Sequence, residues 1–571
     1  MEHSLLFETL EQQKAFQEKM MKDTNYDNML AEIKLELDQY LQVEETPLTF
    51  SDFRQFFDSG SRIEYEKIYF QKRKRLNTFA IMSLLEPDEH QYLLALENTI
   101  WSICNEFSWC LPAHYSIEAE ANIDLFAAET AFTLAEILSL CKNRLHPLIQ
   151  KQIETEVKER VLTPFQNQGF GWETWTHNWS SVCSGSVGAA ALYLMEDGSE
   201  LTAIIERVVA AMKCYISGFH DDGTCLEGYG YWEYGFGYYV YFADLLKRKT
   251  NGELDLFADE KIKKIALFQQ KTFLYKNRLA NFSDTQATAN IFLGLSHYLH
   301  DLYPEFQVPK ETLRKHFTED HCGRWAPAFR NLLWYDSTKQ GANWKNETIY
   351  LPDSAWYMKR TDTYSFAAKG GHNDEPHNHN DLGHFILQMG EEVFFQDIGA
   401  GLYNRDYFSE KRYSFLPTRS KGHSVPLIDG QEQKAGEKYS ADMHCVTDNQ
   451  IIIDLTDAYG LSYVKQVKRQ FYLQNQQIIM EDHYRFAQTG STITERMVTP
   501  VMEIEEVDEG IILRGEQELM IQYNQQKCHF TYEKTSYMNH FGEKTECLLV
   551  DFTRRHASDD ERLTFIFNIL G

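Results

Sequence analysis

The most informative stretch of the sequence is Gly370-Gly371-His372-Asn373-Asp374-Glu375-Pro376-His377-Asn378-His379-Asn380-Asp381-Leu382-Gly383-His384. Four of the chain's 20 histidines lie within its last thirteen residues. Pro376 excludes a continuous helix, because proline lacks a backbone N–H and clashes with the preceding turn. We therefore predict an extended or turning segment. In an extended chain, His377, His379 and Asp381 would project to one side.

Strand patterns accompany this stretch and continue to the C-terminus. Short apolar or alternating runs occur at residues 393–395, 451–455, 464–471, 478–480 and 563–567. Turn residues separate these runs, and such spacing is typical of an antiparallel β-sandwich. We predict this domain over residues 346–571.

Helical patterns dominate the first half of the chain. Leu93, Leu96, Ile100 and Ile103 recur at intervals of three and four residues, which places them on one helical face. Further helices are predicted over residues 123–138, 186–195, 201–219, 234–249 and 285–300. Paired helices of this kind predict an α/α toroid, an incomplete barrel, over residues 81–340, preceded by a helical extension over residues 1–80.

Length and charge restrict the class of protein. A chain of 571 residues is too long for one compact core, so two or three domains are expected. The net charge of −28 argues against nucleic acid and anionic membrane surfaces as partners. No run of 18 apolar residues is present, so we expect no membrane-spanning helix.

The cysteines and the N-terminus predict a cytoplasmic location. The ten cysteines form no C-x-x-C pair and no disulfide-like framework, which fits reduced thiols. The first residues lack a basic segment followed by an apolar one, as a signal peptide would have.

A zinc site is one hypothesis for the histidine-rich stretch. Asp397 ends an apolar strand and His423 precedes another, so both can join His379. Two imidazoles and a carboxylate suit Zn²⁺. The alternative is a polar, solvated loop. His377-x-His379-x-Asp381 also resembles a metallo-hydrolase run, but Leu382 stands where that run has histidine.

Two clusters in the first half of the chain could bind or act on a substrate. Residues 175–183 precede a small-residue helix expected to begin near Gly185, and a helix N-terminus favours a carboxylate ligand. The alternative is an ordinary capped turn, with Trp175 and Trp179 in the core. Residues 221–239 alternate glycine with tyrosine, which allows close backbone approach and several phenols at a cleft wall.

Together these clusters resemble the heparinase II/III family of lyases over roughly residues 80–570. His177-Asn178-Trp179 is similar to the family's carboxylate-recognition turn, and Asp222 to Tyr234 to its tyrosine loop. Residues 371–383 are similar to the signature of its β-sandwich domain. The resemblance implies an α/α toroid followed by an antiparallel β-sandwich.

The resemblance also implies a function and its residues. The protein would cleave uronic-acid glycans or oligosaccharides, most of all glycosaminoglycans, by β-elimination, leaving 4,5-unsaturated uronate ends. Asn178 would bind the uronate carboxylate, Tyr231 would be the catalytic phenol and His377 would face the substrate. Structural zinc would be held by His379, Asp397 and His423. Further catalytic candidates are Tyr234, His177 and Tyr413, and substrate-binding candidates are Trp179, Glu227, Arg405 and Arg412.

The chemistry of β-elimination requires these residue types. An amide and an imidazole can stabilise the charge that moves onto the uronate carboxylate. A base removes the C5 proton, and an acid protonates the departing O4 oxygen. A tyrosine could serve either step if nearby cations lower its pKa.

Two other functions remain open. An inverting α/α-barrel glycoside hydrolase needs a pair of carboxylates, which Glu173, Asp222, Glu227 and Glu233 could supply. A relative without activity would bind glycans and release no product. The uronate glycan, endo or exo action, and homo-oligomer formation are not decided by the sequence.

Overall fold

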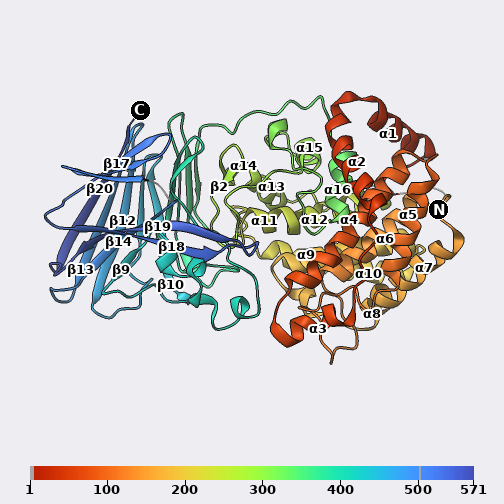
Figure 1. Cartoon of the computed structure of the whole chain (residues 1–571), viewed down its shortest axis with the longest axis horizontal. Coiled ribbons are helices and arrows are strands. Elements are labelled where there is room, and N and C mark those ends of the chain that lie inside the picture. The colour runs from red at the N-terminus through yellow and green to blue at the C-terminus, as the bar shows by residue number, and fades with distance from the viewer. Residues whose placement is uncertain (1–4, 501–502, 571) are drawn as a thin grey trace. The chain divides into compact units, whose positions relative to one another are not determined.

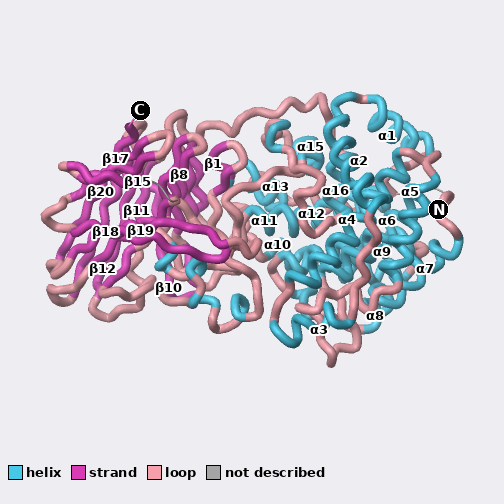
Figure 2. Tube along the Cα trace, in the orientation of Figure 1, coloured by secondary structure: helices cyan, strands magenta, loops and turns pink. Residues whose placement is uncertain are grey.

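The computed structural model describes residues 5–500 and 503–570 and divides the chain into two compact units. The helical unit comprises the chain up to Phe219, Trp232–Ala266 and Asn290–Ala342. The β-rich unit comprises His220–Tyr231, Leu267–Ala289 and the chain from Asn343 onward. Figure 2 shows mainly helices in the helical unit and mainly strands in the β-rich unit. Two short segments of the predicted toroid domain thus belong to the β-rich unit.

Helices form the helical unit along most of its length (Figure 1). Their bounds are α1 Leu10–Lys22, α2 Asp27–Gln42, α3 Phe50–Ser59, α4 Ile63–Leu85, α5 His90–Cys104, α6 Leu125–Cys141, α7 Pro147–Val157, α8 Thr163–Asn167, α9 Asn178–Leu194, α10 Ser199–Ser217, α12 Gly237–Lys249, α13 Glu260–Ala266, α15 Leu293–Leu302 and α16 Trp325–Leu333. Among the described residues, no helix is long and apolar enough to cross a membrane.

Helices α6 and α9 form the centre of this unit. Nearly all their side chains are buried, as expected for helices that are apolar or small-residued on every face. Gly188 of α9 allows close packing. A Cβ there would lie 2.5 Å from Cε2 of Phe242 in α12 and 2.9 Å from Cγ1 of Val208 in α10.

Two predicted helix bounds are wrong. Helix α9 begins at Asn178, not near Gly185, because the buried residues of its first turn, Asn178, Ser180 and Ser181, are polar and give no apolar period. The helix predicted over residues 285–300 begins only at Leu293. Residues 280–292 carry no helix and belong largely to the β-rich unit.

The β-rich unit contains a strand for each predicted run. The short helices are α11 Tyr229–Tyr231 and α14 Phe268–Thr272. The strands are β1 Phe273–Tyr275, β2 Arg278–Leu279, β3 Thr348–Leu351, β4 Trp356–Arg360, β5 Ser365–Lys369, β6 Gly371–Asn373, β7 Phe385–Met389, β8 Glu392–Phe395, β9 Pro426–Ile428, β10 Gly436–Thr447, β11 Gln450–Asp454, β12 Val464–Leu473, β13 Gln477–Phe486, β14 Ile493–Thr499, β15 Glu503–Val507, β16 Gly510–Arg514, β17 Glu518–Tyr523, β18 His529–Met538, β19 Lys544–Arg554 and β20 Asp560–Leu570.

The strands form a sandwich. Among the described residues, nine strands make one sheet in the order β15-β16-β17-β20-β13-β12-β11-β10-β6. A five-stranded sheet, β3-β4-β5-β7-β8, and a four-stranded sheet, β18-β19-β14-β9, pack against it. The pairing is antiparallel, and β12 and β13 bury alternate residues as period-two strands do. The predicted fold class, helical toroid followed by antiparallel sandwich, is confirmed.

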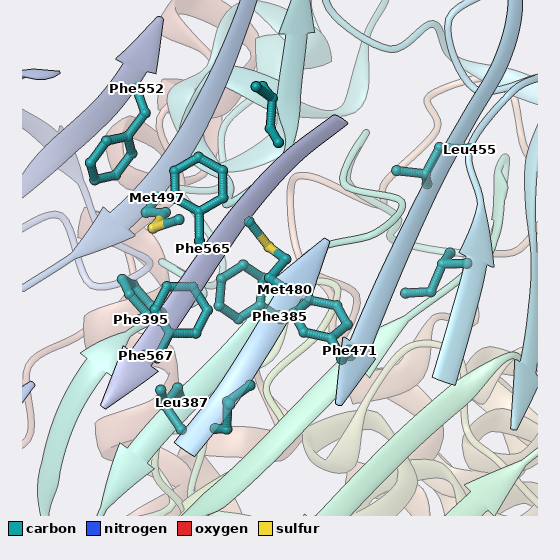
Figure 3. Packing of buried hydrophobic residues seen from close by; sticks show 14 of the residues in the cluster. Phe385, Leu387, Phe395, Leu455, Phe471, Met480, Met497, Phe552, Phe565 and Phe567 are labelled. Atoms are coloured by element: carbon teal, nitrogen blue, oxygen red, sulfur yellow. The ribbon is translucent and has the colours of Figure 1, made fainter. Parts of the chain in front are cut away.

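Aromatic rings join the layers of the sandwich (Figure 3). Phe385 of the five-stranded sheet lies 5.1 Å from Phe471 and 5.9 Å from Phe567 of the nine-stranded sheet, between ring centroids. Phe552 of the four-stranded sheet lies 5.1 Å from Phe565. These rings are fully buried and hold the two layers in register.

Phe385→Ala should lower the free energy of unfolding of the β-rich unit by about 3–5 kcal/mol, because it removes a buried ring and leaves a cavity. Differential scanning calorimetry would measure the shift. Phe541→Ala is the control, since that ring is 59% exposed. Equal melting temperatures for the two variants would contradict the assignment of Phe385 to the core.

Candidate active site

A buried carboxylate, Asp284, is the centre of a polar cluster in the β-rich unit. Its side chain has no exposed area. Its donors, with distances to Oδ1 or Oδ2, are Tyr407 Oη at 2.5 Å, His377 Nδ1 at 2.9 Å, His379 Nε2 at 3.0 Å, Arg412 Nη2 at 3.0 Å and Tyr403 Oη at 3.1 Å. Five donors around one carboxylate satisfy its charge and acceptor capacity.

The segment that carries His377 turns and is not extended. Strand β6 ends at Asn373, and His377 has a φ of 57°, in the left-handed region. The amide of Asn378 donates to the carbonyl of Glu375 across this turn. The strained backbone aims the imidazole at Asp284 on one side and at Tyr231 on the other, whose ring stacks on it at 4.5 Å between centroids.

Tyr231 is a neutral phenol in this site. Its hydroxyl lies 3.0 Å from that of Tyr403. Burial raises the pKa of Tyr231 well above its ordinary value, and the negative charge of Asp284 raises it further, against smaller opposing effects of Tyr403 and Arg412. The condition that nearby cations lower this pKa is not met, because burial and the charge of Asp284 outweigh the effect of the Arg412 guanidinium. Tyr231 is therefore suited to donate a proton.

Three other predicted residues lie around His377. Glu227 Oε1 is 3.5 Å from His377 Nε2, the ring nitrogen opposite Asp284. Arg412 is committed to Asp284 and to the carbonyl of Asn378, so its guanidinium is held by the protein. Tyr413 donates to Oδ1 of Asn378 at 3.0 Å. Arg405, a further predicted substrate-binding residue, is exposed and lies in the same loop as Arg412 and Tyr413.

The helical unit carries the predicted carboxylate-binding turn. Asn178 is buried in the first turn of α9, with His177 as the N-cap residue. Trp179 packs on the imidazole of His114 at 4.8 Å between centroids and on Trp175 at 5.7 Å. Trp175 is 41% exposed and Trp179 is half-buried, so the interpretation of both tryptophans as core residues is wrong.

Tyr234 has partners of its own in the helical unit. Its hydroxyl donates to Glu129, which also accepts from Tyr238 at 2.7 Å. The guanidinium of Arg324 lies 4.0 Å from the centroid of the Tyr234 ring. Tyr231 and Tyr234 are three residues apart but have different partners, because a π-helical turn, Trp232–Phe236, follows Tyr231.

The three predicted metal ligands meet in the β-rich unit. One ligand atom from each of His379, Asp397 and His423, together with one from Asp381, lies within 4.8 Å of the others, and all four side chains are buried. His379 Nε2 contacts Asp284, and His423 Nε2 contacts the carbonyl of Pro417 at 2.7 Å. In neutral imidazoles these contacts place the proton on Nε2, so the Nδ1 lone pairs face Asp397.

This donor set fits a divalent metal ion. His379 Nδ1, His423 Nδ1 and Asp397 Oδ2 have no hydrogen-bond partner of ordinary geometry among the described residues. Two lone pairs and a carboxylate facing one another in a dry interior repel unless a cation lies between them. Imidazole nitrogens and carboxylate oxygens, oriented by outer hydrogen bonds, are the arrangement that Zn²⁺ prefers.

Two neighbours complete the surroundings of this cluster. Asp381 Oδ1 lies 2.9 Å from Nζ of the buried Lys369, so this carboxylate already has a cation. His384 accepts a hydrogen bond at Nδ1 from the amide of Ser424, which places its proton on Nε2, 3.5 Å from Asp397. A protonated nitrogen cannot bind a metal, so His384 lies beside the cluster without being one of its ligands.

The sequence reasoning missed Asp284, Tyr403 and Tyr407. Asp284 lies in a segment with no regular structure, and part of that segment was predicted as helix. The two tyrosines lie in the same aromatic, arginine-containing loop as Arg412. The tyrosines and arginines of that loop could have been recognised in the sequence as candidate site residues, whereas no sequence pattern marks Asp284.

Solved structures share this architecture. A heparinase III has a TM-score of 0.66 at 12% identity, covering 100% of this chain and 92% of that one. The heparan sulfate lyase HepC from Pedobacter heparinus has a TM-score of 0.61 at 14% identity, with the same coverage. The chondroitin AC lyase of Streptomyces coelicolor A3 has a TM-score of 0.56 at 9% identity, covering 98% and 82%. No curated protein matches the sequence.

The fold is therefore that of the toroid-and-sandwich polysaccharide lyases. Residues 345–565 match the family model "Heparinase II/III-like, C-terminal", and this part of the chain is a heparinase II/III-like C-terminal domain. The predicted resemblance to that family is confirmed.

Buried Glu129 should make the stability of the helical unit depend on pH. Burial raises the pKa of Glu129 to about 7, although Arg324, Tyr234 and Tyr238 oppose this. Because the folded protein keeps a proton that the unfolded chain releases above its ordinary pKa of 4.5, stability is lost as the pH rises toward 7. At roughly 1.4 kcal/mol per pKa unit, the loss is roughly 3 kcal/mol.

Urea denaturation of the wild type and of Glu129→Gln at pH 5 and pH 8 tests this. The stability of the wild type relative to the variant should fall between the two pH values. Glu196→Gln, at an exposed position, is the control. The difference in stability between the wild type and this variant should be the same at both pH values. An identical pH response of wild type and Glu129→Gln would contradict the prediction.

Proposed function

We propose that the protein is a lyase that cleaves uronic-acid-containing glycans or oligosaccharides by β-elimination, with glycosaminoglycan fragments as the preferred class. The observation that carries this proposal is the stacked pair of Tyr231 and His377, a neutral phenol beside an oriented imidazole. The fold shared with heparan sulfate and chondroitin lyases supports it.

Tyr231 would be the general acid. Its high pKa keeps the proton on the phenol at neutral pH, so the group can protonate the departing O4 oxygen as the C4–O4 bond breaks. The C5 proton needs a different acceptor, because a phenol that holds its proton cannot remove another.

His377 would be the base. Its Nδ1 is occupied by Asp284, so Nε2 is the nitrogen that can reach a substrate. When Nε2 takes the C5 proton, the imidazolium lies between two carboxylates, Asp284 at 2.9 Å and Glu227 at 3.5 Å. Carboxylates on both sides stabilise that cation as it forms.

Asn178 would hold the uronate carboxylate. Its amide lies in the first turn of α9, where free backbone N–H groups and the helix dipole favour an anion. Trp179, the next residue, offers an apolar ring for the sugar. A neutralised carboxylate acidifies the C5–H bond and stabilises the charge that develops in the transition state.

We further propose that His379, Asp397 and His423 hold a structural Zn²⁺. When bound, the metal would neutralise Asp397 and fix the loops that carry His377, and it would take no part in proton transfer. The unpartnered nitrogens and the unpartnered carboxylate oxygen support this.

The hydrolase alternative receives less support. Glu173 forms a salt bridge with Arg207 at 2.7 Å, and Glu233 pairs with Lys315. Asp222 accepts hydrogen bonds from Ser354. Three of the four candidate carboxylates thus have structural partners, and the fourth, Glu227, faces His377.

We propose a cytoplasmic setting and exo action on short oligosaccharides. The ten cysteines are free thiols, most of them buried, which suits a reducing compartment. The acidic chain also favours short substrates, because a long polyanion would meet repulsion beyond the site.

Tyr231→Phe should lower the turnover of uronate oligosaccharides by about 10²–10⁴-fold, because it removes the proton donor. The melting temperature should change little, since phenylalanine keeps the stack on His377. The assay is ultraviolet absorbance of the new C4–C5 double bond across a substrate panel. Tyr532→Phe, at a 56% exposed position, is the control. Undiminished activity would move the acid role to Tyr234 or Tyr413, and sugar release without absorbance would favour the hydrolase.

Metal analysis of the purified protein should find about one zinc per chain. His423→Ala should lose the metal and lower the melting temperature, because binding free energy contributes to folding. His444→Ala, at an exposed position, should keep both. Substoichiometric zinc in the wild type together with an unchanged melting temperature in His423→Ala would refute the site.

A further inference from the structure

Asp284 holds two histidines that lie two residues apart in the chain. Its Oδ2 contacts Nδ1 of His377, and its Oδ1 contacts Nε2 of His379. An ionised carboxylate only accepts hydrogen bonds, so each contacting nitrogen carries the proton. The two imidazoles are therefore held as opposite tautomers. In the neutral imidazoles, this leaves Nε2 of His377 and Nδ1 of His379 without a proton.

The same carboxylate fixes the direction of a phenol pair. Tyr403 donates its single proton to Oδ2 of Asp284 at 3.1 Å. In the 3.0 Å contact between the two hydroxyls, Tyr403 must then be the acceptor and Tyr231 the donor. Asp284 thus keeps Tyr231 in the state that can give a proton away.

The backbone of Asp284 is held on two sides. The Ser283 hydroxyl donates to the carbonyl of Leu226 at 2.8 Å, in the turn that leads to Tyr231. The Asn281 side-chain amide donates to the carbonyl of Asp397 at 3.1 Å. Ser283 has a φ of 64°, a strained conformation that these bonds maintain. The segment therefore ties the metal-binding cluster to the Tyr231 segment.

We propose that Asp284 is a positioning residue of the site, which sets the tautomers of His377 and His379 and the proton direction of Tyr231, and so couples the metal-binding cluster to the reacting groups. It acts through these residues and does not itself touch the substrate. The activity readout of this inference rests on the proposed function, whereas its tautomer readout does not.

The first experiment needs no substrate. Long-range ¹H–¹⁵N spectra of protein with ¹⁵N-labelled histidine, compared with His377→Ala to assign the signal, report which nitrogen of His377 carries the proton. We expect Nδ1–H in the wild type and a mixture of tautomers in Asp284→Asn. An Nε2–H tautomer in the wild type overturns the proposal, even if the variant does not fold.

The second experiment separates positioning from a general structural role. Asp284→Asn keeps the shape of the side chain, but its amide N–H group would face the hydrogen-bond donors that the carboxylate accepts from. We therefore expect kcat to fall about 10–100-fold and the affinity for zinc to fall by a similar factor. KM should change less than kcat. Asp374→Asn, which removes an exposed carboxylate three residues before His377, is the matched control.

Tyr403→Phe is a milder variant, because it leaves Asp284 with its imidazole and guanidinium donors. It should lower kcat while the His377 tautomer stays as in the wild type. Wild-type kcat and unchanged histidine spectra in Asp284→Asn would overturn the proposal. If neither the wild type nor Asp374→Asn acts on any uronate oligosaccharide, the proposed function fails, and the histidine spectra still decide the role of Asp284.

Discussion

Pairing of buried charge is the requirement on which the β-rich unit depends. Asp284, Lys369, Asp397 and Arg469 are buried, and an isolated charge in such a place costs several kcal/mol. Arg469 pairs with Asp482 at 2.6 Å and with Glu495 at 2.9 Å, between two layers of the sandwich. Lys369 pairs with Asp381, and Asp284 with Arg412. Asp397 faces two imidazole lone pairs, and it is here that a metal cation would complete the set.

The sandwich supplies the rigidity that these pairs need. His377 and His379 lie in the connection between β6 and β7, and Asp397, Tyr403 and Arg412 in the longer one between β8 and β9. The first connection ends at β7 and the second starts from β8, and both of these strands pack in the aromatic core of Figure 3. Irregular segments can then keep unusual backbone conformations, because strands and hydrogen bonds on either side over-determine them.

The same burial that organises the site decides its chemistry. In a dry environment beside Asp284, a phenol keeps its proton and an imidazole is held in one orientation, so the surroundings of these two groups would separate the proposed acid from the proposed base. The architecture persists among lyases at 9–14% identity, which indicates that periodicity and packing specify the fold. The chemistry, by contrast, depends on a few residues at loop positions.

The sequence by itself determined the helical first half, the strand-rich second half and the importance of residues 371–384, because helical and strand periods and a proline are local signals. It also indicated His379, Asp397 and His423, which the fold brings together. Only the tertiary structure decided that Asp284 joins the site, that Tyr403 is the partner of Tyr231 across 172 positions, and that α9 begins at Asn178. It also decided that burial and the charge of Asp284 raise the pKa of Tyr231. Hydrogen bonds between distant segments and the burial of a phenol arise from packing, and neither leaves a periodic trace in the chain.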